Sequence, residues 1–188
     1  NILWALMALL VWFYFTPDIK TMKNFNVDWC LYIYARNAVI IFLYTSFFHL
    51  YLYVFKFQDN NFKYNLSPLE NRSSKFIFKN QFIDNLIWTF LSAVPIWSAY
   101  EITFFWMFAN GYIMSINFES NPIYFIILFL LIPIFHSIHF YFTHRLLHTK
   151  ILYNVAHKIH HHNNNPGPWS GLSMHPIEHI IYFSGVFI

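Results

Sequence analysis

Four long apolar segments, separated by polar loops, dominate the pattern of hydrophobic and polar positions along the chain. They cover residues 2–15, 29–55, 86–108 and 123 to about 142. A helix that crosses a bilayer needs about 20 mostly apolar residues, and the last three segments reach that length. The first has neither a basic start nor a small-residue cleavage site, so we interpret it as a shortened spanning helix rather than a signal peptide. The pattern predicts an all-α integral membrane fold with about four transmembrane helices.

The composition agrees with a membrane protein. Hydrophobic residues make up 57% of the chain and charged residues 10%, with a mean hydropathy of +0.41, whereas a soluble domain carries about 25% charged residues. The formal net charge is +3, and no basic run is interleaved with aromatic residues, so nucleic acid is not an expected partner. Cys30 is the only cysteine, which rules out an intrachain disulfide or a CxxC metal site.

The loops differ in charge. Residues 56–81 contain five basic and two acidic residues, whereas residues 110–122 contain no lysine or arginine. The positive-inside rule therefore predicts that residues 56–81 are cytosolic. Counting spans from there, the residues that follow position 142 also emerge on the cytosolic side.

Arg36, His49 and Glu101 are ionisable residues that fall inside the predicted spans. Such groups usually face the interior of a helix bundle and pair with one another. We interpret them as an internal polar pair or as side chains that reach a membrane boundary, with a substrate contact as the alternative.

Two sets of histidines follow the last apolar segment at helical spacing. The members of the sets are His144 and His148, then His157, His160 and His161. Residues three or four apart share one face of a helix, so each set can present several imidazoles in one direction. Neutral imidazole is a good ligand for Fe, Zn, Cu and Ni, and Glu178 is the only carboxylate from residue 123 onward. We predict that the five histidines converge on one metal site, with room for two ions.

Two other interpretations of this region stay open. A cationic helix at the membrane surface, with Arg145, Lys150 and Lys158 on lipid phosphates, explains the basic residues but not the repeated imidazoles. The HPIEH sequence matches the HxxEH signature of zinc hydrolases, with His175 and His179 as ligands and Glu178 as the base. The intervening HHNNNPGPWSGLSMHP is rich in turn formers, so we predict a surface loop there and Pro in the first turn of the next helix.

The order HFYFTHRLLH, then HKIHHHNNNPGPWSGLSMHPIEH, resembles the fatty acid hydroxylase superfamily, most closely its sterol desaturase branch. The resemblance extends upstream to about residue 29, through ARNAVIIFLYTSFFHLYLYVFKFQ and FKNQFIDNLIWTFLSAVPIWSAYE. It implies a single membrane domain over residues 1–188 with a histidine-box region at 136–179. It also implies that the metal ligands are His144, His148, His157, His160 and His161.

The resemblance assigns roles to four more residues, either as ligands or as partners that orient ligands: His139, His175, His179 and Glu178. We assign His136 and His162 to packing and to the surface. The implied cofactor is a pair of Fe ions, with Zn as a substitute in a purified sample, and the implied reaction is hydroxylation or desaturation of a sterol or fatty acyl C–H bond with O2 and two electrons. No nicotinamide or flavin fingerprint is present, so the electrons would come from a partner such as cytochrome b5 or a reductase.

The family carries a further HxxHH box beyond the HP segment, and we expect the native polypeptide to continue past Ile188 and supply it. The alternative is a catalytically reduced relative that serves as a structural subunit of a membrane protein complex. The resemblance also implies the endoplasmic reticulum membrane in a eukaryote, with another organelle or a bacterial inner membrane as alternatives.

Overall fold

The computed structural model describes residues 2–59, 61, 63 and 65–187, and their regular structure is helical. The long helices are α1 (Ile2–Tyr14), α2 (Val27–His49), α3 (Gln81–Trp88), α4 (Val94–Ala109), α5 (Pro122–Leu147) and α8 (Pro176–Phe183). The shorter ones are η1 (Ile19–Lys23), η2 (Leu50–Val54), η3 (Ile77–Lys79), η4 (Thr89–Ala93), α6 (Lys150–Leu152), η5 (Tyr153–His157), α7 (Lys158–His160), η6 (Ser170–Leu172) and η7 (Ser184–Phe187). Apart from an isolated bridge between Asn71 and Asn80, the described residues form no β-structure.

Among the described residues, three helices are long and apolar enough to cross a membrane, where about four were predicted. They run over Val27–Val54, Gln81–Ala109 and Pro122–Leu147, so the all-α membrane class is confirmed; the first of them nearly keeps its predicted length, and the other two are several residues longer than predicted. Over the first predicted span, the described residues form the shorter apolar helix α1, whose 13 residues extend about 20 Å at 1.5 Å per residue.

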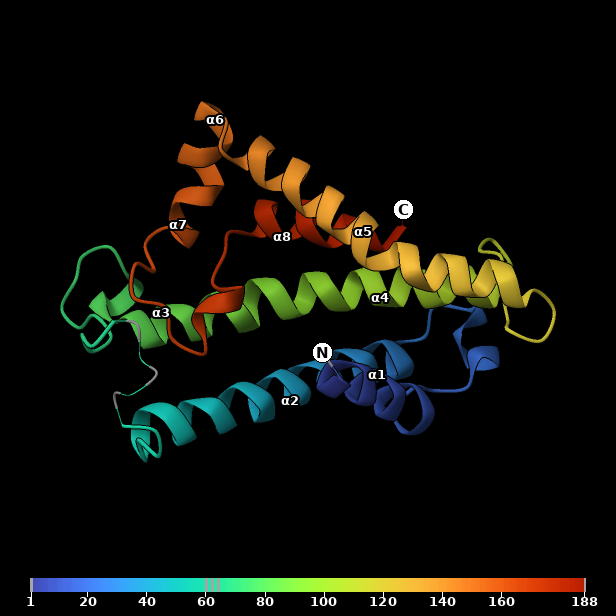
Figure 1. Ribbon diagram of the computed structural model, residues 1–188, viewed down its shortest axis with the longest axis horizontal. Helices are drawn as coiled ribbons and strands as arrows, with labels where there is room; N and C mark the ends of the chain where they lie inside the picture. Colours follow the sequence, from blue (N-terminus) through green and yellow to red (C-terminus); the bar gives the residue numbers. More distant parts are fainter. Residues whose placement is uncertain (1, 60, 62, 64, 188) are drawn as a thin grey trace.

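The continuous helix α3–η4–α4 forms the centre of the molecule. In Figure 1, α1 and α2 lie on one side of this helix, and α8 and α5 lie on the other. The contacts agree, since α4 touches both α2 and α8. Capping side chains set the start of two of these elements: Asn26 accepts from the backbone N–H of Asp28 at 2.8 Å, and Asn80 from that of Ile83 at 3.0 Å. The sequence thus encodes where the spans begin as well as how far they extend.

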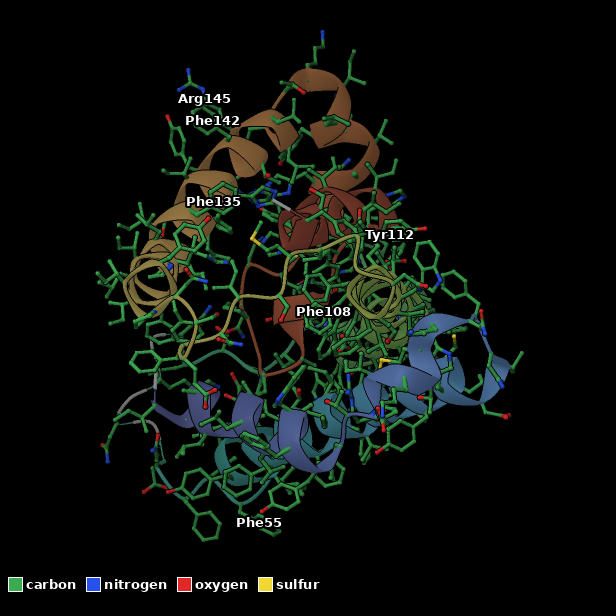
Figure 2. All side chains as sticks on the ribbon, turned by 90° about the vertical axis from the view of Figure 1, so that its right-hand side faces the viewer. Phe55, Phe108, Tyr112, Phe135, Phe142 and Arg145 are labelled. Atoms are coloured by element: carbon green, nitrogen blue, oxygen red, sulfur yellow. The ribbon has the colours of Figure 1, made fainter. Side chains whose placement is uncertain are left out.

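Helix α5 leans away from the rest of the bundle. None of the residues in its most apolar 18-residue window is buried. Figure 2 shows Phe135, Phe142 and Arg145 pointing outward from its outer side, and Phe142 is 64% exposed. Such a surface suits lipid hydrocarbon, because an apolar helix face gains nothing from contact with water.

The segment that joins α7 to α8 is folded against the bundle and is not the surface loop that its turn formers predict. Asn165, Trp169, Ser170 and Ser173 are buried in it. The Asn165 amide donates to the carbonyl oxygens of Ser67 and Pro68, and its own carbonyl accepts from Gln81 Nε2 at 2.8 Å. Polar side chains thus supply hydrogen bonds to buried backbone groups. In a surface loop, these groups would bond to water instead. Pro176 does begin α8, as predicted.

These same hydrogen bonds place the loop before Gln81 and the segment after α7 at one end of the spans. Tyr53, at the end of the first long span, also donates to the carbonyl of Pro166. The predicted span count requires the two segments to share a side of the membrane, and their contacts agree with it.

Candidate metal centre

Four of the five histidines predicted as ligands bring their Nε2 atoms together. The Nε2–Nε2 distances are 3.1 Å between His144 and His148, 3.3 Å between His148 and His157, and 3.1 Å between His157 and His161. The ligating atoms of His144, His148 and His157 all lie within 4.8 Å of one another, which makes them the one such group of three found among the described residues.

The spacing of these nitrogens fits a metal ion. With metal–nitrogen bonds of about 2.0 to 2.1 Å, two neighbouring ligand atoms lie about 2.9 to 3.4 Å apart. The closest nitrogens of the cluster fall in that interval. A neutral imidazole carries one N–H, so the Nε2 atoms of His148 and His157, which each meet two others, are better explained as ligand atoms than as members of a hydrogen-bonded chain. The residues present therefore fit the metal that the histidine pattern predicts.

Local structure aims the two sets at each other. His144 lies in the last turn of α5 and His148 is its C-cap residue, with its N–H on the carbonyl of His144. Thr149 is extended, and the chain turns into α6 immediately after it. A π-helical turn, η5, then carries His157 into the interior, where it is fully buried. Such turns are frequent at functional sites because they change which face a residue occupies.

Helix α8 holds two of the imidazoles by their other nitrogen. Glu178 Oε1 lies 2.9 Å from Nδ1 of His157, and Tyr182 Oη lies 3.0 Å from Nδ1 of His144. The two residues are four apart, so they project from one face of α8. Metal-binding histidines commonly donate their second N–H to such a group, which sets the tautomer and the ring orientation. Glu178 was among the candidates, whereas Tyr182 was missed, although its i+4 position after Glu178 was a usable signal.

Burial keeps His157 neutral in the absence of a metal. It lowers the pKa of His157 to about 3, with the neighbouring imidazoles His161, His144 and His148 adding to the effect. Burial also raises the pKa of Glu178 to about 8. The close contact between the two has the geometry of an ion pair, but both pKa values favour a neutral hydrogen bond near pH 7. Neutral imidazole is the form that binds metal, and a cation at Nε2 would favour the carboxylate form of Glu178.

The remaining predicted residues surround the cluster without joining its Nε2 contacts. His160 stacks on His157 with ring centroids 5.6 Å apart. His179 meets Ser92 Oγ at 2.8 Å through Nδ1, and His175 accepts from the N–H of Ile177. Two buried ring nitrogens, His160 Nδ1 and His179 Nε2, have no hydrogen-bond partner among the described residues.

Three other histidines lie outside the cluster of Nε2 atoms: His136 and His139 on α5, and His162 just after α7. His139 Nε2 is 3.4 Å from Ser184 Oγ and 3.5 Å from Thr143 Oγ1, so it contacts neither set of ligands. His136 is exposed rather than packed. His162 is half-buried, edge-on to Phe76.

The zinc-hydrolase interpretation of HPIEH loses its geometric basis here. That signature needs both histidines on one metal with the glutamate beside it. In the structure, His175 caps the start of α8, His179 turns to Ser92, and Glu178 turns to His157. The three side chains therefore face three different partners.

Comparisons with known proteins place the histidine-rich region in a family. The model of the fatty acid hydroxylase family matches residues 129–188. Methylsterol monooxygenase 1 from Gallus gallus is 44% identical over 48 residues, and so is methylsterol monooxygenase 1 from Rattus norvegicus. Each of these alignments covers 26% of this chain and 16% of the relative. No solved structure matches the chain. Residues 129–188 of the chain are therefore similar to the fatty acid hydroxylase family and, within it, to methylsterol monooxygenases.

Proposed function

We propose that the protein is a membrane-bound di-iron oxygenase that hydroxylates or desaturates a C–H bond of a sterol or fatty acyl lipid. The observation that carries this proposal is the convergence of the Nε2 atoms of His144, His148, His157 and His161, in a region that matches the fatty acid hydroxylase family. The matched relatives are named methylsterol monooxygenases, which favours a sterol among the lipids. One domain over residues 1–188, with its histidine-box region at 136–179, carries the activity.

The proposed ligands are the five histidines of the two sets, with His160 as the fifth. The partnerless nitrogens of His160 and His179 point to more coordination than the four meeting nitrogens provide. We therefore include His179 and His175 as candidates for the second ion, and assign His139 to packing. When bound, two iron ions would supply O2 activation and the removal of hydrogen from the lipid.

The residues of the chain prepare this chemistry in three ways. Glu178 and Tyr182 hold the rings of His157 and His144 so that Nε2 faces the site. Burial of His157 keeps it neutral and limits access of water from that side. The exposed apolar face of α5 leads along the membrane to His144 at its end, so a lipid can reach the centre without leaving hydrocarbon.

The electrons come from a partner such as cytochrome b5 or a reductase, because the chain itself shows no flavin or nicotinamide fingerprint. We place the histidines on the cytosolic side, in the endoplasmic reticulum membrane if the source is eukaryotic. Support comes from the basic loop at residues 56–81 and from its hydrogen bonds to the segment after α7.

The test combines metal content with lipid oxidation. The purified wild-type protein should hold close to two irons per chain, with a Mössbauer signature of nitrogen-ligated iron, and should oxidise lipid when a reductase is supplied. The variant His157→Ala should lose both the iron and the turnover while still inserting into membranes. His136→Ala, on the exposed face of the same region, is the matched control and should keep both.

A wild-type protein without bound metal and without turnover would refute the oxygenase and favour the structural-subunit alternative. Turnover that survives in His157→Ala would show that the histidine boxes are not the catalytic site.

A further inference from the structure

A second polar cluster lies inside the membrane-spanning region, between α2 and α4. The Arg36 guanidinium donates to Glu101 Oε1 at 2.5 Å and to Asn37 Oδ1 at 2.9 Å. Asn37 in turn donates to Glu101 Oε2 at 2.7 Å and to Ser98 Oγ at 3.1 Å. This cluster confirms the internal polar pair predicted for Arg36 and Glu101.

The cluster sits deep in the bilayer. Arg36 is nine residues from the start of α2 and Glu101 eight from the end of α4, which places both about 12 to 14 Å from that end of their helices. The two ends are joined, because Asn110 donates to the carbonyl of Lys23. An ionisable pair at such depth is costly, and residues of this kind usually serve a function.

Part of the cost is offset by structure. Arg36 Nη1 donates to the carbonyl of Phe15, at the end of α1, and so anchors this short helix against the bundle. If anchoring α1 were its only role, the pair could be fully buried among side chains. The pair is not sealed, since the Glu101 side chain keeps 20% of its exposure while that of Arg36 keeps 4%.

A cavity of about 330 Å³ opens beside the pair, between α1, α2 and α4. Its polar wall is formed by Arg36, Asn37 and Glu101, and its apolar wall includes Val11, Trp12, Ile40, Trp97 and Phe105. A few polar groups at one point of an otherwise apolar cavity are the usual form of a small-molecule site. The residues that line the cavity belong to α1, α2, α4 and the turn after α1, and in both views α1 and α2 lie on the side of α4 opposite α5 and α8 (Figures 1 and 2). The cavity is therefore separate from the histidine cluster.

The donors and acceptors of the polar wall fit a ligand whose polar group is a neutral hydroxyl. Arg36 uses four of its five N–H groups on described residues, and each oxygen of Glu101 accepts one bond and can accept another. A hydroxyl can donate to Glu101 and accept from Arg36 at the same time. The pair is neutral overall, so an anionic or cationic head would bring an uncompensated charge into a medium of low dielectric.

We propose that this cavity binds the hydroxyl head of a neutral membrane amphiphile, whose apolar body lies along the wall formed by α1, α2 and α4. The site is independent of the metal centre and does not rest on the proposed oxygenase activity. Two sources of the same chemistry, a sterol and a long-chain alcohol, fit the head group, and the experiment distinguishes them.

The experiment uses the purified full chain in lipid nanodiscs with two photoreactive, clickable probes, one a sterol and one a long-chain primary alcohol. Mass spectrometry maps the cross-links. At least one probe should label peptides of α1, α2 or α4 around the cavity. An excess of the unlabelled parent alcohol should reduce the labelling at least fivefold, whereas its methyl ether, which cannot donate to Glu101, should not. This competition needs no variant, so it stays decisive if a variant fails to fold.

A pair of variants on α1 then tests whether the labelled probe lies in the cavity. Ala8 lines the cavity, and Ala8→Phe should fill it and reduce labelling at least fivefold. Leu9→Phe adds a ring to the exposed side of the same helix and should leave labelling unchanged. Equal competition by the ether, or labelling that Ala8→Phe does not reduce, overturns the proposal and leaves Arg36 and Glu101 as a purely structural pair.

Discussion

Removal of the Glu178 carboxylate should weaken metal binding without removing a ligand. The perturbation is Glu178→Ala, which leaves the four meeting Nε2 atoms in the chain but deletes the oxygen 2.9 Å from His157 Nδ1. His157 is fully buried, so no water replaces the lost partner without rearrangement. The ring then loses the contact that sets its tautomer and orientation.

The magnitude follows from comparable contacts. Loss of a group that orients a metal ligand typically costs about 10 to 100-fold in affinity, which corresponds to about 1.4 to 2.8 kcal/mol. Glu178→Gln should cost less than Glu178→Ala, because the amide oxygen still accepts from Nδ1–H. It lacks the negative charge that a metal-bound imidazole favours, so its affinity should fall between those of the wild type and the alanine variant.

The assay is anaerobic competition for Fe(II) against a chromophoric chelator, with the purified protein in detergent. It reads affinity directly and does not depend on turnover. Glu119→Ala removes an exposed carboxylate from the loop at the other end of the spans and should have no effect. If Glu178→Ala binds iron as tightly as the wild type, then the contact with His157 does not support a metal ligand, and the assignment of α8 to the site is wrong.

Two further predictions concern stability. In the metal-free protein, the raised pKa of Glu178 (about 8 against an ordinary 4.5) should cost stability as pH rises towards 8, and the lowered pKa values of His157 (about 3) and His179 (about 4) should cost stability as pH falls below 6.5. Thermal unfolding should therefore show maximal stability near pH 6.5. The wild type should lose about 2 kcal/mol of stability between pH 6.5 and 8, at about 1.4 kcal/mol per pH unit, and Glu178→Gln should remove this loss. A wild-type stability that does not change between pH 6.5 and 8 would contradict this. Glu101→Leu should destabilise the protein by about 3 to 5 kcal/mol because it leaves the Arg36 guanidinium without its counter-charge, and Arg36→Met in the same chain should restore most of the loss; an unfolding temperature that the double variant does not raise would contradict this.

The pattern of apolar positions was sufficient for the three long spans, because a bilayer imposes length and composition on any helix that crosses it. It also predicted the apolar helix over residues 2–15, which the structure has as α1. It failed for the segment after α7. Turn formers indicate where the chain changes direction, but not that Asn165 and Gln81, 84 residues apart, hydrogen-bond and bury the turn.

Helical spacing correctly grouped the histidines into two sets, since side chains four apart share a face regardless of the rest of the fold. Spacing could not show which nitrogens meet. His160 shares a helical face with His157 and His161, yet only His157 and His161 join the Nε2 contacts, whereas the ring of His160 stacks on that of His157. The contact between His144 and Tyr182 spans 38 residues and depends on how α8 packs against α5, which no local pattern contains.

Helix α8 connects the histidine cluster to the central helix α3–η4–α4. One of its faces contacts the cluster, through Glu178 and Tyr182. Its other contacts reach the η4–α4 helix, where His179 meets Ser92 and the Tyr100 hydroxyl donates to the carbonyl of Ile180. A shift of α8 along α4 would therefore move both orienting groups relative to imidazoles carried by α5 and η5. Since ligand orientation controls affinity, the geometry of the proposed metal site would depend on helix packing within the membrane as well as on the histidines themselves.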